Sequence, residues 1–158
     1  MNIKNFNKIV IVSLCDRFSR SLSKHLSQSL EMLYCDSKDL VEYELIDKDQ
    51  LKRFATREYL DNAERSVFRH IESFENVVVS ISFDHLLRYV DLLKKSSLIV
   101  FVKLSKTFVK EKSTIANAIS YDLRTSELEK MSTITICVKK TDKEFVANKI
   151  MEKIGEML

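Results

Sequence analysis

The architecture of this chain follows from the stretch KIVIVSLCDRFSRSLSKHLSQSL, which runs from Lys8 to Leu30. It begins with a continuous apolar run, Ile9 to Val12, which is typical of a strand buried on both faces. After a short loop, apolar residues recur at every fourth position: Phe18, Leu22, Leu26 and Leu30. That spacing is typical of an amphipathic helix. The stretch therefore predicts a strand, a loop and a helix in direct succession.

Strand and helix patterns alternate along the rest of the chain. Further apolar runs cover Met32 to Cys35, Val77 to Ser82, Ser97 to Leu104 and Thr133 to Val138. Helical patterns cover Tyr59 to Phe74, Asp84 to Lys94 and Asp142 to Leu158. This alternation predicts a three-layer α/β/α sandwich with a five-stranded parallel sheet. Because ligands bind beyond the carboxyl ends of such strands, the loop from Ser13 to Phe18 is the first place to look for a site.

Length and composition predict a single domain that spans residues 1–158, since 45% of these residues are hydrophobic. The longest apolar stretches, such as Ser97 to Val102, are far shorter than the roughly 20 residues of a membrane span. Residues 1–8 lack the apolar run of a signal peptide. The cysteines have no paired spacing, and we expect all three to be reduced and buried: Cys15, Cys35 and Cys137. The sequence therefore predicts a cytoplasmic protein without membrane contact.

The charge pattern does not predict nucleic-acid or metal binding. Net charge is +3, from 26 basic and 23 acidic residues. Lysines gather between Lys94 and Lys112, but aromatic residues do not alternate with them as stacking platforms would. We expect a solvated face there. The histidines do not have the spacing of metal ligands, so none is assigned to a metal: His25, His70 and His85.

Glycine is almost absent from this chain, which has Gly155 alone and no proline. Loops that bind phosphate depend on glycine, because successive backbone N–H groups must converge without a Cβ in the way. Gly155 falls in the predicted last helix. The usual phosphate-binding loop therefore cannot form at low conformational cost.

Four stretches resemble shikimate kinases in their order and spacing. LEMLYCDSKDLVE, from Leu30 to Glu42, looks like the segment that carries the Asp-x-Asp motif of that family. LDNAERSVFRHI resembles its Phe-Arg-x-x-Glu helix, and NVVVSISFD resembles the third strand before a triple-glycine turn. RTSELEKMSTITICVKKTDKEFVANKIMEKI looks like the segment with the last arginine, strand and helix. The resemblance implies a P-loop kinase fold and ATP-dependent phosphorylation of shikimate.

The phosphate-binding motif of the family is replaced in this chain. Its loop falls on Ser13 to Ser21, and the resemblance puts the phosphate-binding lysine position on Ser19 and the magnesium-binding hydroxyl position near Arg20. Asp16 and Phe18 stand where the family has glycines. We predict a degenerate P-loop marked by Ser13, Asp16, Phe18, Ser19 and Ser21.

The substrate positions of the family are only partly retained. The resemblance matches Asp36 to the first aspartate of Asp-x-Asp, but puts Lys38 at the second. The substrate arginine of the Phe-Arg-x-x-Glu helix falls on Asp61, although Glu64 matches, and the triple-glycine turn falls on Ser82, Phe83 and Asp84. Arg124 keeps a substrate-arginine position, while the family's lid has no match. Asp36 and Arg124 are thus the candidate ligand-binding residues. Their alternatives are an N-cap for Asp36 and a surface ion pair for Arg124.

We expect the Asp16 carboxylate to act as an N-cap of the first helix, in the place of a phosphate. Phosphoryl transfer depends on positioned N–H groups, a lysine and magnesium, and these are missing together. The sequence therefore predicts a non-catalytic shikimate kinase-like binding or interaction module, with no catalytic residue and no cofactor. Its partner would be another protein or a small anion near Arg124.

The alternative is a divergent small-molecule kinase that uses ATP and magnesium on shikimate or a similar hydroxylated substrate. Other lysines would then replace the missing one, and the candidates are Lys38, Lys103 and Lys106.

Overall fold

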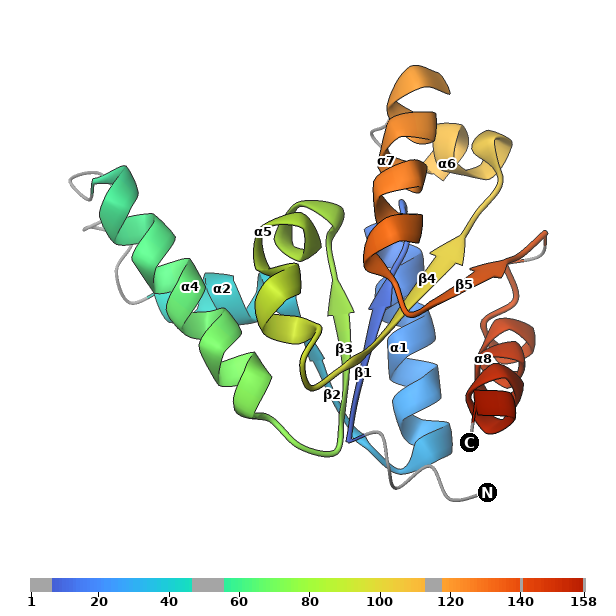
Figure 1. Cartoon of the computed structure of the whole chain (residues 1–158), viewed down its shortest axis with the longest axis horizontal. Coiled ribbons are helices and arrows are strands. Elements are labelled where there is room, and N and C mark those ends of the chain that lie inside the picture. Colours follow the sequence, from blue (N-terminus) through green and yellow to red (C-terminus); the bar gives the residue numbers. More distant parts are fainter. Residues whose placement is uncertain (1–6, 47–55, 113–117, 140, 158) are drawn as a thin grey trace.

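The chain alternates strands and helices from one end to the other in a computed structural model (Figure 1). The structure describes residues 7–46, 56–112, 118–139 and 141–157. The strands are β1 (Lys8–Val12), β2 (Leu33–Asp36), β3 (Val77–Ile81), β4 (Leu98–Lys103) and β5 (Ile134–Cys137). The helices are α1 (Asp16–Leu30), α2 (Ser37–Ile46), α4 (Arg57–Ser73), α5 (Phe83–Leu93), α6 (Lys106–Lys112), α7 (Ala118–Met131) and α8 (Lys143–Met157).

The strands form one five-stranded parallel sheet in the order β2-β3-β1-β4-β5. β1 lies in the middle, with Val10 in register with Val79 of β3 and with Ile99 of β4. α1 and α8 pack together on one face, and α4, α5 and α7 follow one another on the other (Figure 1). The predicted three-layer α/β/α sandwich is confirmed. No helix in the described ranges is long and apolar enough to span a membrane.

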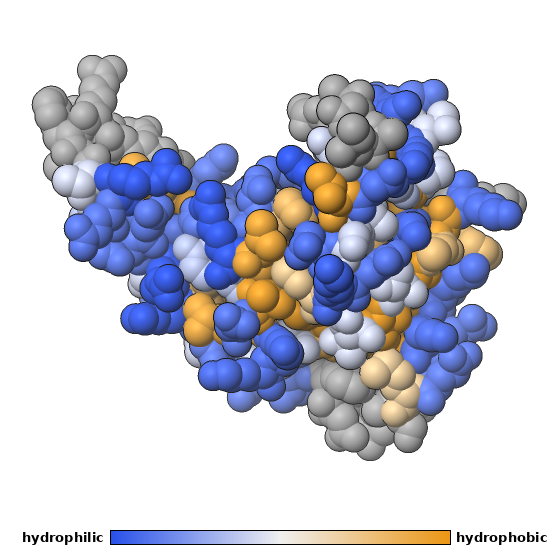
Figure 2. Space-filling model, turned by 45° about the horizontal axis from the view of Figure 1, so that its top comes forward, coloured by the Kyte–Doolittle hydropathy of each residue, from blue (hydrophilic) through white to orange (hydrophobic). Residues whose placement is uncertain are grey.

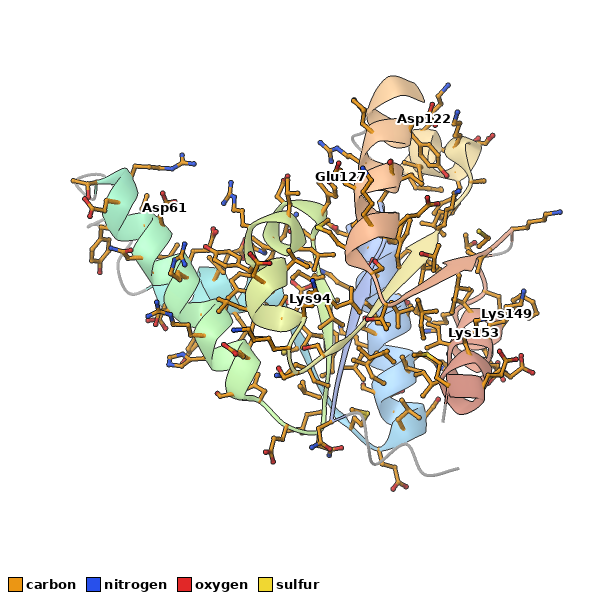
Figure 3. The ribbon with its side chains drawn as sticks, viewed as in Figure 1. Asp61, Lys94, Asp122, Glu127, Lys149 and Lys153 are labelled. Atoms are coloured by element: carbon orange, nitrogen blue, oxygen red, sulfur yellow. The ribbon has the colours of Figure 1, made fainter. Side chains whose placement is uncertain are left out.

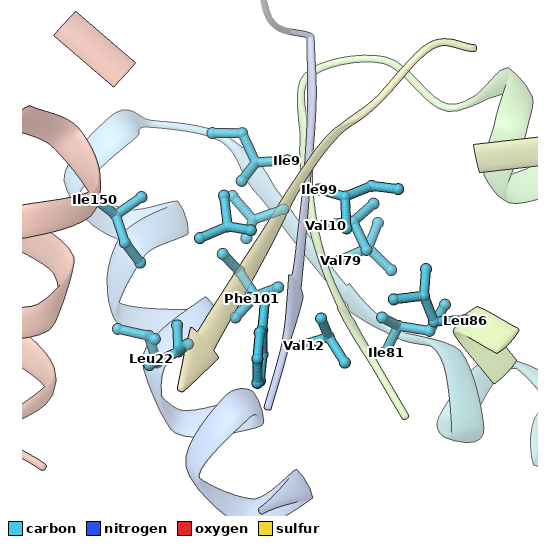
Figure 4. Close-up of a cluster of buried hydrophobic side chains, with 14 of the residues drawn as sticks. Ile9, Val10, Val12, Leu22, Val79, Ile81, Leu86, Ile99, Phe101 and Ile150 are labelled. Carbon is cyan, nitrogen blue, oxygen red and sulfur yellow. The ribbon is translucent and has the colours of Figure 1, made fainter. Parts of the chain in front are cut away.

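Both faces of the central strands are buried, as their unbroken apolar runs predict. All residues of β1 and β3 are buried. Figure 4 shows side chains leaving the sheet in both directions, with Leu22 and Ile150 on one side and Leu86 on the other. β5 differs, because its residues alternate between buried and exposed at one edge of the sheet. The expectation that all three cysteines are buried is therefore met by Cys15 alone, since Cys35 is half-buried and Cys137 is exposed.

α1 buries serines as well as leucines. Ser19, Ser23 and Ser27 lie on a stripe with four-residue spacing and are each at most 4% exposed. The sequence alone favours solvent for these serines, because polar residues usually mark the outer face of a helix. The helix packs against both the sheet and α8, so a second stripe is covered. Small side chains there allow these neighbours to approach closely.

Replacing Ser23 by alanine should stabilise the fold. The Ser23 hydroxyl is buried and has no hydrogen-bond partner among the described residues. An unsatisfied buried hydroxyl is unfavourable, and alanine has the higher helix propensity. We expect Ser23→Ala to raise the free energy of unfolding by about 1 kcal/mol in urea denaturation. Ser27→Ala is the matched control, because Ser27 Oγ donates to the Lys24 carbonyl at 2.7 Å. An equal gain from both variants would contradict this explanation.

Candidate functional site

The loop between β1 and α1 is short and closed by its own hydrogen bonds. α1 begins at Asp16, so only residues 13–15 separate it from the strand. Ser13 Oγ donates to the Cys15 carbonyl at 2.9 Å and accepts the Cys15 N–H at 3.2 Å. It also lies 2.5 Å from Ser19 Oγ, and both serines are buried. The space inside the turn is therefore filled by two hydroxyl groups of the chain.

The backbone donors of this loop are partly used within the chain. Ser19 stands at the lysine position of the resemblance, and its N–H donates to the Cys15 carbonyl at 3.0 Å as an ordinary helical bond. Phe18, at a glycine position, is buried and packs edge-on against Phe108 with ring centroids 6.3 Å apart. A helical turn thus occupies positions where the family has its glycine-rich loop.

Asp16 does not cap α1, so that expectation is wrong. The N-cap is Cys15, which has extended backbone angles and no side-chain hydrogen bond to the helix. Asp16 lies in the first turn, where its negative charge still interacts favourably with the positive end of the helix dipole. Its Oδ2 is 2.7 Å from Lys38 Nζ at the start of α2. Asp16 therefore links the N-termini of α1 and α2 through an ion pair and does not cap α1.

Asp36 binds a cation that the chain itself supplies. Its Oδ2 is 3.1 Å from Arg20 of α1, whose guanidinium is also 3.5 Å from Asp39. The other oxygen, Oδ1, accepts the Ser80 hydroxyl at 2.5 Å. Asp36 is only 6% exposed, so these contacts satisfy a nearly buried carboxylate. The predicted capping role is confirmed as well, because Oδ2 accepts the Asp39 N–H at 3.1 Å in the first turn of α2.

A second polar cluster joins α2, α4 and α5. His85 Nδ1 lies 2.9 Å from the hydroxyl of Ser37, and Nε2 lies 3.7 Å from Glu64. Glu64 accepts from Tyr89 at 2.7 Å and from Arg88 at 3.0 Å. Burial lowers the pKa of His85, so the neutral imidazole is favoured. The retained Glu64 thus has partners within the protein.

Sequence reasoning did not find this cluster. Ser37, His85, Arg88 and Tyr89 belong to no motif. They meet around Glu64 because α4 packs against both α2 and α5. The one available signal is His85 within an apolar helical stripe. Such a histidine usually marks a satisfied core position.

The other predicted substrate positions do not gather at one point. Figure 3 shows Asp61 near the outer end of α4, away from the sheet, where it pairs with Arg57 at 3.5 Å. Ser82 is the N-cap of α5 and accepts the His85 N–H at 3.3 Å. Arg124 lies over the ring of Phe83 at 5.0 Å from its centroid. Among the described residues no carboxylate pairs with Arg124, so the alternative of a surface ion pair is not found.

A hollow of about 370 Å³ opens beside the N-terminus of α1. Ser21, the last predicted loop residue, lies on its wall and is half-buried. Its wall is part cationic and part aromatic, formed by Cys15, Arg17, Phe18, Ser21, Phe108 and Lys112. Basic and aromatic side chains therefore lie side by side on this wall.

Comparison with known proteins finds no matching protein family and no matching curated protein. Solved structures do match. A shikimate kinase from Aquifex aeolicus superposes with a TM-score of 0.75 at 18% identity, over 94% of this chain and 96% of that one. The chain has the shikimate kinase fold. A shikimate kinase from Acinetobacter baumannii in complex with shikimate gives 0.68 at 14% identity, over 96% and 94%. A gluconokinase from Sinorhizobium meliloti gives 0.58 at 14%, over 96% and 94%.

The His85 cluster should make stability depend on pH. Because the folded-state pKa lies below the unfolded value of about 6.5, stability is full above that pH and falls as the pH drops toward the folded-state pKa. We expect His85→Gln to flatten the fall in melting temperature below about pH 6.5. His70→Gln, at an exposed position of α4, should leave it unchanged. If both variants keep the wild-type slope, the His85 pKa is not the cause.

The two ion pairs that join α1 to α2 should differ in strength. Arg20→Ala leaves the nearly buried Asp36 without its cation, and we expect a loss of about 1–3 kcal/mol in the free energy of unfolding. Lys38→Ala breaks a pair of which both side chains are at least 40% exposed. Such pairs contribute about 0–1 kcal/mol. Urea denaturation of both variants compares them, and equal losses would contradict the assigned difference.

Proposed function

We propose that this chain is a shikimate kinase-like protein that does not transfer phosphate and serves as a binding or interaction module. The observation that carries the proposal is the closed turn after β1. Ser13 Oγ takes the Cys15 N–H, and the Ser19 N–H is committed to the helix. Phosphoryl transfer is catalysed mainly by positioned N–H groups and cations, so a turn in which part of the N–H donors is already in use offers less to a triphosphate.

The residues at the predicted magnesium position do not fit a metal ion. Arg20 brings a guanidinium there in place of a hydroxyl, and Asp36 has both oxygens engaged by Arg20, Ser80 and the Asp39 N–H. No three side chains of His, Cys, Asp or Glu gather at one point in the described ranges. A fixed internal cation adjacent to Asp36 repels a second one.

The lysines that the kinase alternative requires have carboxylate partners. Lys38 is paired with Asp16 at 2.7 Å, Lys103 with Glu129 at 3.0 Å, and Lys106 with Asp122 at 3.0 Å. Each would have to leave its partner to meet a phosphate. This arrangement favours the non-catalytic proposal over a divergent kinase.

Exposed apolar residues of α5 and α7 favour an interaction role. Leu87 of α5 is 47% exposed and Leu123 of α7 is 64% exposed. Figure 2 shows hydrophobic residues in the middle of a largely hydrophilic surface. Arg124 and the half-buried Phe83 lie in the same two helices. Exposed apolar side chains and arginine are enriched on surfaces that bind another protein.

The proposal predicts no thermal stabilisation by ATP with magnesium, with or without shikimate. A site filled at one hundred times its dissociation constant would add about 2.7 kcal/mol, which is roughly 5–10 °C in melting temperature for a chain of this size. Differential scanning fluorimetry measures the shift, and a coupled assay measures ADP release. The Aquifex aeolicus shikimate kinase is the positive control. Stabilisation together with shikimate-dependent ADP release would establish the kinase alternative.

A further inference from the structure

The open edge of the sheet at β5 lacks the usual protection against pairing. β5 is the last strand in the sheet order, and its sequence is Ile134-Thr135-Ile136-Cys137. Three of its residues are β-branched, and none is charged or proline. Natural edge strands commonly carry lysine, proline or a bulge that prevents another strand from adding. This edge is therefore suited to pairing with a further strand.

The pairing with β4 determines which backbone groups face outward. The Val138 N–H donates to the Lys103 carbonyl at 3.1 Å, just beyond the end of the ladder. Backbone groups of a strand point to its two sides at alternate residues. The backbone N–H and C=O groups of Ile134 and Ile136 therefore point toward β4, as the N–H of Val138 does. Those of Thr135 and Cys137 point to the open edge.

α8 carries a stripe of alternating charge next to this edge. A hollow of about 230 Å³ has Thr135, Ile136 and Cys137 on one side, and on the other Lys149, Glu152, Lys153 and Glu156. Figure 3 shows Lys149 and Lys153 projecting from α8 at the β5 end of the sheet. Within one chain, Lys153 Nζ lies 3.6 Å from Glu156, and both side chains are more than half exposed. The stripe has two charges of each sign.

We propose that β5 pairs antiparallel with β5 of a second copy of this chain, so that the dimer has one continuous sheet. The two-fold axis of such a pair is perpendicular to the sheet, and it keeps both α8 helices on the same face and antiparallel. With the axis between Glu152 and Lys153, Lys149 lies opposite Glu156 of the partner subunit. Glu152 likewise lies opposite Lys153 of the partner subunit.

Charge complementarity favours a second copy over an unrelated strand. When two copies of the order Lys, Glu, Lys, Glu run in opposite directions, each lysine lies opposite a glutamate. A two-fold axis between antiparallel helices imposes this arrangement. An unrelated extended peptide would need no such symmetry. Because the strand is short and the ion pairs are exposed, the dimer should dissociate in the micromolar range. This inference does not rest on the proposed absence of catalysis.

Sedimentation velocity of the full chain from low to high micromolar concentration tests the proposal. We expect a reversible monomer–dimer equilibrium. Lys149→Glu should weaken the dimer by about tenfold or more, because it reverses one member of two symmetric pairs. The double variant Lys149→Glu/Glu156→Lys restores opposite charges across the axis and should return close to wild type. Lys94→Glu, a charge reversal at the exposed residue that follows α5, is the control and should have no effect.

A second variant tests the strand itself. Thr135→Pro removes an N–H that points to the open edge and leaves the bonds to β4 in place. We expect a monomer with a wild-type circular dichroism spectrum. A wild-type chain that stays monomeric at all concentrations would overturn the proposal. So would a dimer that neither Lys149→Glu nor Thr135→Pro weakens. If Thr135→Pro does not fold, the charge-reversal pair decides alone.

Discussion

The ion pair between Arg20 and Asp36 connects the two helix N-termini that border the candidate site. Asp36 ends β2 and caps α2, while Arg20 lies one turn into α1. A nearly buried carboxylate needs a partner, since an unpaired buried charge is strongly unfavourable. Here the partner is a side chain of the chain itself. The same residue that fixes the backbone at the start of α2 therefore also fixes α1 relative to the sheet.

Internal contacts join the polar side chains around the candidate site. Two serine hydroxyls fill the turn after β1, and Asp16 is paired with Lys38. Glu64, which matches the family's helix motif, is bound by Tyr89 and Arg88. Each of these contacts satisfies a polar group without any ligand. These contacts therefore stabilise the fold without a bound ligand.

Much of the fold could be predicted from sequence because it depends on local pattern. Continuous apolar runs identify the buried strands, and helical spacing identifies α1, α4 and α5 within one or two residues of their ends. The buried serines of α1 could not be found in this way, because their burial depends on what α8 covers. The exposure of Cys137 also depends on packing, because an edge strand is exposed on alternate residues although its sequence is apolar.

In the candidate site as well, the sequence predicts contacts between neighbouring residues but not contacts between distant elements. Capping by Asp36 is a local matter of three residues, so the sequence predicts it correctly. The partner of Asp16 is Lys38, on a different helix, and the His85 cluster joins residues of three helices. Such contacts depend on packing between distant segments, and a single sequence does not contain that information. The likeness to solved shikimate kinases, at 14–18% identity, extends to the fold alone.

A titration of the backbone amide signals by nuclear magnetic resonance tests the central claim most directly. The chain is labelled with nitrogen-15, ATP with magnesium is added, and the amides of Asp16, Arg17 and Phe18 at the start of α1 are followed. If the turn after β1 is closed, these signals stay in place up to high nucleotide concentration. Saturable shifts of these three amides would show phosphate bound at the helix N-terminus and would contradict the account.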